Sequence, residues 1–507
     1  MTTNIRRTAA GVGALTLAIT ATTAPASAVP AETGPSTSVS PYLVPANDAV
    51  TVTSLLTVDD QDRADKGVDM VGIPDGLGAV GAGRDLVLYM NHEFPATAGA
   101  VHAHGQTGAF VSRNVIDPAT GRVKETTDLV QDVRYYDYGT HSYVESPTSG
   151  TPEFNRFCSG SLSDPGILYD QTSKAGLKGQ LYFGNEENNP EGRNFAVTQD
   201  GIATQLPRLG LFAWENTLVA DTGNRATLVI GTDDNASGQL RIYTGQKQRS
   251  GTAVDKAGLT NGSLHVLDVV NQAVSTDSGY RSTYGKGNPT PVQANQVAWD
   301  ATGAQQEAEG SAKALNLNRI EDGAFDPQHP NDFYFFTTEG GDKTSRENDP
   351  VTGAPITRDG GGLWRLRFAD VSDPSAGMTL ELVLDGSEAP YLNKPDNMDI
   401  DHEGHLLIQE DPGGNAHLAR VLAYDIGSGS ITTLAQFDPA RFASGATGYP
   451  RTIDEESSGI IDVADLMGSG TFLLDAQIHT SAGLSDPARQ VEHGQLLTMS
   501  VDWNRVF

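Results

Sequence analysis

The stretch DHEGHLLI at 401–408 consists of an Asp-containing turn, a glycine and then a short apolar strand, and the fold prediction rests on this pattern. The same unit returns as DNASGQLRI at 234–242 and, more loosely, as DPQHPNDFYF at 326–335. A unit of turn and strand that repeats without strict identity is typical of the blades of a β-propeller with insertions. The repeat therefore favours a propeller, with a sandwich or a paired barrel as the alternative.

Short β-type runs of four to six residues recur along the chain, and Gly, Asp or Asn usually bounds them. Amphipathic helices are scarce, and no alternation of strands with long helices indicates a parallel α/β sheet. We therefore predict an all-β fold, a β-propeller with inserted loops and short helices. The runs lie at 85–90, 180–183, 226–230, 239–243, 262–267, 332–336, 362–366, 405–408, 420–424, 471–474 and 495–499.

The charge balance is strongly acidic. With 34 Lys and Arg against 64 Asp and Glu, the 507-residue chain has a formal net charge of −30. This argues against a nucleic-acid scaffold role, because such proteins neutralise phosphates with Lys and Arg. An acidic surface suits Ca²⁺, which prefers oxygen ligands, but it also keeps secreted proteins soluble. Cation sites are therefore argued only from local clusters.

The N-terminal segment is typical of an exported protein. Arg6 and Arg7 precede a mildly apolar stretch at 8–22, and Ala-Ser-Ala at 26–28 matches a cleavage site. Either the general secretory or the twin-arginine route fits this segment. No later stretch is long and apolar enough for a membrane span, so we expect a secreted, extracellular protein without a membrane anchor. We also expect a monomer. The predicted divisions are a signal peptide at 1–28, an extended Pro/Ser/Thr-rich segment at 29–48 and a propeller catalytic domain at 49–507.

Acidic and polar side chains gather at the ends of several predicted strands. Adjacent carboxylates repel each other unless a cation neutralises them. One such cluster alone is as well explained by a solvated turn or a cap, but five together predict a shared cation site. The clusters are NHE at 91–93, GNEEN at 184–188, GTDDN at 231–235, RIED at 319–322 and PDNMDID at 395–401. Their candidate metal ligands are Glu93, Glu186, Glu187, Asp233, Asp234, Glu321 and Asp396.

The single cysteine, Cys158, lies in the segment NRFCSG at 155–160. An isolated cysteine is often a small buried hydrophobe, but a thiolate is also a good ligand for a transition metal. The chain has no G-x-S-x-G nucleophile elbow and no phosphate-cradling P-loop, so neither a serine hydrolase nor a P-loop enzyme is supported. Both interpretations of Cys158 stay open on the residues alone.

In order along the chain, these clusters resemble the PhoX-type alkaline phosphatase family, of which the chain would be a divergent member. The resemblance implies an exported β-propeller enzyme with a mixed Ca²⁺ and Fe³⁺ centre that hydrolyses small-molecule phosphate esters. It extends from about 71 to 497 but is carried by short motifs. These are NHE at 91–93, NRFCSG at 155–160, NEEN at 185–188, GTDD at 231–234, RIED at 319–322 and KPDN at 394–397.

The resemblance also implies roles for individual residues. Cys158 resembles the family's iron-ligating cysteine, and Glu321 looks like a bridging metal carboxylate. Arg319 is similar to the guanidinium that holds the substrate phosphate, and such a planar fork suits a phosphoryl group. Arg319 and Glu321 are therefore the predicted catalytic residues, and Arg319, Arg156 and Asn91 the predicted substrate-binding residues. Glu93, Asp396 and Glu215 resemble further metal ligands, although the sequence around Glu215 departs from the family's V-E-x-D-P pattern.

The predicted function is hydrolysis of phosphate esters by a metal-dependent phosphoesterase. Cations that bind phosphoryl oxygens can offset charge that develops during in-line displacement, so no protein nucleophile is required. One alternative is a calcium-dependent propeller hydrolase of the phytase or lactonase type, which needs the carboxylates but no iron. The other is a non-catalytic extracellular binding module in which calcium adds only stability.

Overall fold

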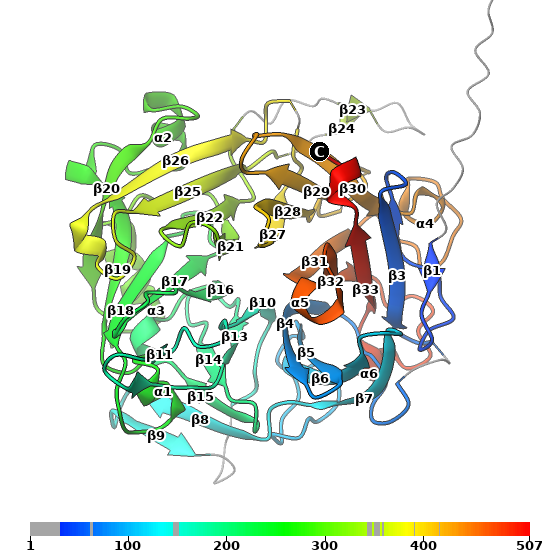
Figure 1. Cartoon of the computed structure of the whole chain (residues 1–507), viewed down its shortest axis with the longest axis horizontal. Coiled ribbons are helices and arrows are strands. Elements are labelled where there is room, and N and C mark those ends of the chain that lie inside the picture. Colours follow the sequence, from blue (N-terminus) through cyan, green and yellow to red (C-terminus); the bar gives the residue numbers. More distant parts are fainter. Residues whose placement is uncertain are drawn as a thin grey trace, which may run out of the picture.

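The computed structural model describes residues 31–60, 64–145, 152–341, 347–348, 355–356, 359–389, 391–414 and 416–507. The predicted signal peptide at 1–28 lies outside the described residues. Sheets of short, mostly antiparallel strands stand in a ring around a common centre, which we call the channel, and one edge strand of each blade lies nearest to it (Figure 1). The predicted β-propeller is therefore confirmed.

The ring has six blades in the described part of the chain. The four-stranded sheet, the six-stranded sheet and both five-stranded sheets each form one blade. The nine-stranded sheet holds two blades, joined where β20 (Thr290–Val297) pairs with β26 (Met378–Asp385). In each blade the three innermost strands follow one another outward in chain order, so that six separate innermost strands lie together at the centre.

The first three blades contain the following strands, given from the channel outward. Blade one has β4 (Pro74–Ala82), β5 (Asp85–His92), β6 (Phe110–Asp117) and β7 (Arg122–Asp128). Blade two has β10 (Phe157–Leu162), β13 (Tyr182–Glu186), β14 (Asn194–Val197), β15 (Ile202–Gln205), β8 (Asp132–Asp137) and β9 (Ser142–Glu145). Blade three has β16 (Trp214–Val219), β17 (Ala226–Asp233), β18 (Arg241–Gln246) and β19 (Ser263–Val269), followed by the joining strand β20.

The last three blades follow the same order. Blade four has β21 (Ile320–Phe325), β22 (Asp332–Thr337), β25 (Gly362–Phe368) and β26. Blade five has β27 (Pro395–Ile400), β28 (His405–Glu410), β29 (Arg420–Asp425), β30 (Ile431–Phe437) and β2 (Leu43–Pro45). Blade six has β31 (Glu455–Asp462), β32 (Thr471–Ile478), β33 (His493–Val501), β3 (Val50–Thr57) and β1 (Glu32–Thr33).

Helices and small hairpins lie in the connections. The hairpins pair β11 (Tyr169–Asp170) with β12 (Ala175–Gly176) and β23 (Glu347–Asn348) with β24 (Pro355–Ile356). No helix in the described ranges is long and apolar enough to cross a membrane. The α-helices are α1 (Ala253–Lys256), α2 (Asp277–Thr283), α3 (Gly303–Ser311), α4 (Pro439–Phe442), α5 (Ala464–Met467) and α6 (Pro487–Gln490). The 3₁₀ turns are η1 (Pro207–Leu209), η2 (Val270–Gln272), η3 (Pro374–Ala376) and η4 (Trp503–Arg505).

The two ends of the chain close the ring in one blade. The early strand β3 pairs antiparallel with the late strand β33, so that Val50 lies opposite Val501. From residue 31 on, the segment that the sequence predicts to be extended supplies β1 and β2, which pair with β3 in blade six and with β30 in blade five. This segment therefore adds edge strands to two neighbouring blades.

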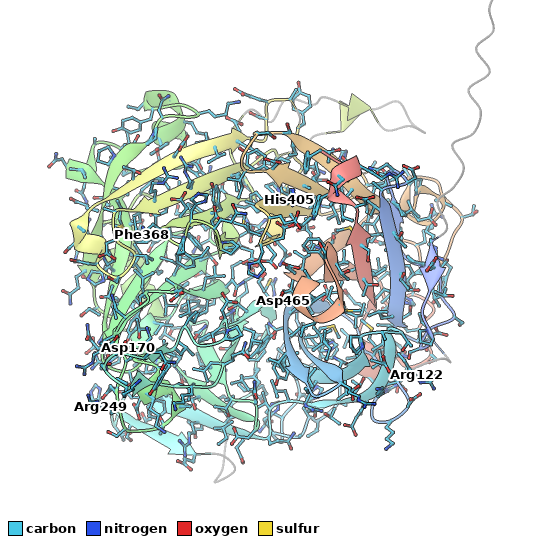
Figure 2. All side chains as sticks on the ribbon, viewed as in Figure 1. Arg122, Asp170, Arg249, Phe368, His405 and Asp465 are labelled. Carbon is cyan, nitrogen blue, oxygen red and sulfur yellow. The ribbon has the colours of Figure 1, made fainter. Side chains whose placement is uncertain are left out.

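Apolar cores lie between neighbouring blades, where facing sheets bury alternate side chains. One core joins Leu88 and Met90 of blade one to Leu473 and Leu496 of blade six, and all four are at most 1% exposed. Side chains fill the spaces between the ribbons, while charged residues such as Arg122 lie at the outer rim (Figure 2). Burial of this kind stabilises the ring by roughly 25 cal/mol per Å² of apolar surface.

Candidate metal centre

The second residue of every innermost strand is a carboxylate or a thiol. In five of the six strands a β-bulge covers this residue, with register shifts such as Pro74/Leu77 in β4 and Trp214/Thr217 in β16. A bulge re-aims a side chain, and bulges of this kind often stand beside active sites. We call these six residues the inner ring: Asp75, Cys158, Glu215, Glu321, Asp396 and Glu456.

A second repeat supplies the residue that directly follows the second strand of each blade. In four blades it is a carboxylate, and in the other two it is Thr338 or His479. Because both repeats lie where strands meet the channel, inner and outer positions of neighbouring blades come close together. We call these six residues the outer ring: Glu93, Glu187, Asp234, Thr338, Asp411 and His479.

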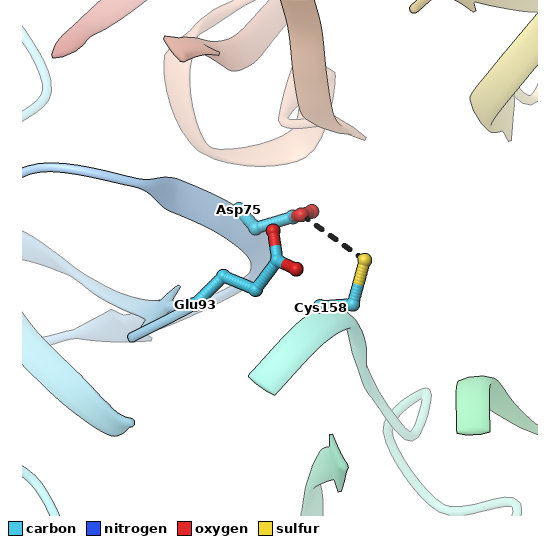
Figure 3. Close-up of side chains that lie close together, drawn as sticks. All are labelled: Asp75, Glu93 and Cys158. Carbon is cyan, nitrogen blue, oxygen red and sulfur yellow. Dashed lines mark hydrogen bonds between the residues drawn. The ribbon is translucent and has the colours of Figure 1, made fainter. Parts of the chain in front are cut away.

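Three groups drawn from the two rings bring possible metal ligands close enough together to hold a metal ion. Within each group, one ligand atom from every residue lies within 4.8 Å of the others. The groups share Cys158 and Glu215, so they form one continuous arrangement, which we call the seven-residue group. Figure 3 shows its first corner, where the Cys158 Sγ lies 3.4 Å from an Asp75 Oδ2. The groups are Asp75–Glu93–Cys158, Cys158–Glu187–Glu215 and Glu215–Glu321–Asp396.

The electrostatics of the seven-residue group favour a bound cation. Burial, followed by repulsion from neighbouring carboxylates, raises the pKa of Asp75, Glu215 and Asp396 well above the usual range. Burial likewise raises the pKa of the Cys158 thiol, and nearby carboxylates raise it further. Opposite charge nearby is what returns such groups to their ionised, metal-binding forms. The donors therefore fit hard cations together with one thiolate-binding metal.

Two arginines lie beside the seven-residue group. Arg156 donates to Glu93 Oε1 at 2.8 Å and to Glu187 Oε2 at 2.5 Å. Arg319 donates two hydrogen bonds of 2.8 Å to the carboxylate of Asp234, and its Nη2 lies 3.2 Å from Glu321 Oε1. Each arginine directly precedes an innermost strand and adopts a left-handed backbone, with φ of 50° and 55°. Ile73 and Lys394, which precede the innermost strands of blades one and five, have the same backbone, so this conformation is a repeated feature of the blades.

Asn91 lies beneath this layer and not within reach of a substrate. Its side chain is 0% exposed, its Nδ2 donates to the Cys158 carbonyl at 2.7 Å, and its Oδ1 accepts from the Tyr182 hydroxyl at 2.8 Å. The strand that carries Cys158 approaches β4 so closely that a methyl group on Gly76 would lie 1.9 Å from the Gly160 nitrogen. The predicted substrate contact of Asn91 is therefore corrected: the residue holds the backbone of Cys158.

Glu186 and Asp233, two of the predicted metal ligands, are not part of the seven-residue group. Each is the last residue of a strand, and its successor points to the channel, so strand alternation turns it into the blade. Glu186 binds Arg193 with two contacts of 2.6 Å. Asp233 lies 3.7 Å from Arg241. Asp234 faces the channel but is bound by Arg319 outside the three groups.

Asp75 and Glu456 are members of the inner ring that the sequence reasoning missed. Asp75 follows a proline in Pro74-Asp75-Gly76, as Asp396 does in Pro395-Asp396-Asn397, and this match is the signal that could have found it. Glu456 differs from the other five because His479 contacts it at 3.3 Å. In contrast, Glu215 lies in two of the groups, despite the departure of its local sequence from the family pattern.

Comparison with known proteins agrees with this description. The fold and the site together are those of a metal-dependent propeller enzyme. The family model described as alkaline phosphatase PhoX matches residues 196–452, slightly more than half of the chain, so the chain belongs to the PhoX alkaline phosphatase family. The predicted family and the predicted enzyme class, a metal-dependent phosphatase, are confirmed. The matched range includes Glu215, Glu321 and Asp396 but not Asp75, Glu93 or Cys158.

One solved structure supports the same fold. Pseudomonas fluorescens PhoX in complex with vanadate, a transition state analogue, aligns with a TM-score of 0.58 at 12% identity over 94% of this chain and 97% of that chain. A luciferin-regenerating enzyme aligns with a TM-score of 0.32 at 9% identity, covering 85% of this chain and 92% of the other. No curated protein sequence gives a significant match.

Proposed function

We propose that the chain is a secreted phosphoesterase that hydrolyses small-molecule phosphate esters at a calcium and iron centre held by the seven-residue group. The observation that carries this proposal is the fusion of three ligand groups through Cys158 and Glu215. A set of acids that merely kept the surface soluble would lie apart in solvent. Here Asp75, Glu215 and Glu321 are each at most 1% exposed.

The donor atoms of the groups favour two kinds of metal. Thiolate ligands select transition metals, so the two groups that contain Cys158 suit iron. The third group, Glu215–Glu321–Asp396, offers only oxygen atoms, which suits calcium. When bound, such cations supply charge neutralisation for the phosphoryl oxygens. Cys158 then serves as a ligand, which leaves no role for it as a nucleophile.

The arginines supply the remaining part of the proposed site. Arg319 and Arg156 each contact two carboxylates, which holds both guanidiniums in place beside the group. A cation that takes the charge of Glu321 and Glu187 leaves the arginines able to donate to the equatorial oxygens of a phosphoryl group. We assign phosphate binding to both residues.

Export and domain division belong to the same proposal. The paired Arg6 and Arg7, the apolar stretch and the cleavage-type Ala-Ser-Ala support a signal peptide at 1–28. The mature enzyme would then consist of the extended segment at 29–48 and the propeller domain at 49–507, acting as a monomer. An extracellular enzyme meets phosphate esters that cannot cross a membrane, which fits a small-molecule substrate.

The proposal is tested by p-nitrophenyl phosphate turnover before and after strong chelation, with elemental analysis of the same preparation. We expect iron together with calcium, loss of turnover on chelation and recovery when the metals are restored. Glu321→Ala should lose activity while its far-ultraviolet circular dichroism stays that of the wild type. Full activity after complete metal removal, or in Glu321→Ala, would contradict the proposal.

A further inference from the structure

A layer of amide side chains lies directly beneath the outer ring. In four blades, the residue two positions before the outer-ring residue is Asn or Gln, and it is 0% exposed. Strand alternation places it under the outer-ring side chain, on the same face. Asn91 donates to the Cys158 carbonyl and Gln409 donates to the Ser457 hydroxyl, both across to the next blade. The four amides are Asn91, Asn185, Gln409 and Gln477.

Gln477 is the member of this layer that contacts carboxylates of the seven-residue group. Its Nε2 donates to Asp75 Oδ2 at 3.0 Å and to Glu93 Oε2 at 3.4 Å, and it lies 3.1 Å from the Ser458 hydroxyl. Both carboxylates come from blade one, whereas Gln477 belongs to blade six. The amide therefore joins the first and last blades at the corner of the proposed centre that holds Asp75 and Glu93.

The same corner contains the thiol. Asp75 Oδ2, which accepts from Gln477, also lies 3.4 Å from the Cys158 Sγ, and Asp75 Oδ1 accepts from Asn397 at 3.4 Å. Asp75 and Glu93 are like charges when ionised and would turn apart without a donor between them. A neutral amide that donates to both keeps the two carboxylates close to each other and to the thiol without adding charge.

We propose that Gln477 is a positioning residue for the metal held by Asp75, Glu93 and Cys158. The inference rests on the metal centre of the proposed function. Groups that hydrogen-bond to metal ligands fix the orientation of those ligands, and their removal commonly weakens metal binding about 10- to 100-fold. Gln477 acts at one corner, so the all-oxygen group Glu215–Glu321–Asp396 should keep its ion when Gln477 is changed.

The single cysteine of the chain gives a readout that does not depend on catalysis. A metal-bound thiolate reacts slowly with a chromogenic disulfide reagent, so the labelling rate of the metal-loaded protein reports ligation at Cys158. Gln477→Met keeps the side-chain length but removes the donor. We expect at least about 10-fold faster labelling and loss of the thiol-bound metal by elemental analysis, with calcium retained.

Gln409→Met is the matched control, because Gln409 is equally buried at the equivalent position of blade five and its amide donates to a hydroxyl. It should label as slowly as the wild type. Gln477→Leu also removes the donor with an uncharged side chain of similar size and should label fast, which keeps the test usable if the Met variant does not fold.

Wild-type labelling and metal content in a folded Gln477 variant would overturn the inference, as would equal changes in the Gln409 and Gln477 variants. Neither readout requires turnover of a phosphate ester. A protein that protects Cys158 through Gln477 but hydrolyses no phosphate ester would leave the positioning role standing and remove the proposed function.

Discussion

Neighbouring carboxylates at the ends of second strands have opposite surroundings in this molecule. Glu187 faces the channel and belongs to a metal-type group, whereas Glu186 points into the blade, where Arg193 binds both of its oxygens. The same contrast separates Asp411 from Glu410, because Glu410 is held by Arg420 at 2.5 and 2.8 Å. One residue of register thus decides whether an acid joins the channel or the blade.

The acids that point into the blades and the acids that face the channel have their negative charge balanced in different ways. On the blade side, each of Glu186, Asp233 and Glu410 has an arginine at or just before the third strand of its own blade. On the channel side, in the described part of the chain, Arg156 and Arg319 form ion pairs with only three of the six carboxylates of the seven-residue group, namely Glu93, Glu187 and Glu321. The blade acids are balanced within the protein, and the channel acids need cations from outside.

Glu215→Gln should have the largest effect on activity, because Glu215 is a candidate metal ligand in two of the three groups. We expect kcat/KM for p-nitrophenyl phosphate to fall roughly 100- to 1000-fold, as for loss of a residue that stabilises transition-state charge. The metal-free variant should be at least as stable as the metal-free wild type, because one crowded carboxylate is removed. Steady-state kinetics and thermal melting in chelator measure both effects, and unchanged kcat/KM would contradict the account.

Glu186→Gln is the counterpart on the blade side. Removing one partner of a buried ion pair leaves Arg193 uncompensated, so we expect a loss of about 3–5 kcal/mol in unfolding free energy. Metal content and kcat should stay within about 2-fold of the wild type, since Glu186 does not belong to the seven-residue group. Urea unfolding with parallel elemental analysis provides the measurement. Loss of metal in this variant would refute the division between channel and blade.

Arg319→Lys tests whether Arg319 binds the substrate phosphate or only holds Asp234. Lysine keeps the positive charge but loses the planar fork that spans Asp234 and Glu321. We expect KM for p-nitrophenyl phosphate to rise about 10-fold with metal content unchanged, as for loss of one charge-assisted hydrogen bond. A wild-type KM would show that Arg319 serves only to hold Asp234.

The smallest expected effect is a loss of folding stability at low pH, which involves the ion pair of Glu410 with Arg420. Although burial acts to raise it, the Arg420 guanidinium lowers the pKa of Glu410 from 4.5 to about 2. The stability from this pair is therefore fully present above about pH 4.5 and is lost as the pH falls toward 2. Unfolding of metal-free protein should become easier across that window, and Glu410→Gln should show a weaker pH dependence there. An equal dependence in both proteins would count against the blade pair.

Much of the fold followed from local sequence patterns. The turn-Gly-strand unit at 401–408 forms the turn after β27 and the start of β28 in blade five, and the predicted run at 226–230 begins β17. Pairing between distant parts was not visible, because β3 and β33 share no motif that announces their contact. The extended segment at 29–48 likewise gave no sign that two of its stretches would join blades as β1 and β2.

The acidic clusters of the candidate site were predictable from the sequence, but the individual residues that face the channel were not. The pairs Glu186–Glu187 and Asp233–Asp234 are equivalent in sequence, and only strand register separates the channel member from the blade member. Asp75 escaped notice because a single aspartate between proline and glycine is typical of a turn. Its role depends on a bulge in the pairing of β4 with β5 and on the close approach of β4 to β10, which are features of the folded ring.

The central claim is that one shared metal centre occupies the channel. Anomalous diffraction from crystals, collected on both sides of the iron absorption edge and again at longer wavelength for calcium, tests it most directly. We expect an iron peak beside the Cys158 Sγ and a calcium peak among Glu215, Glu321 and Asp396. Channel density that shows no anomalous signal at either element, with metal found only at the outer rim, would contradict the account.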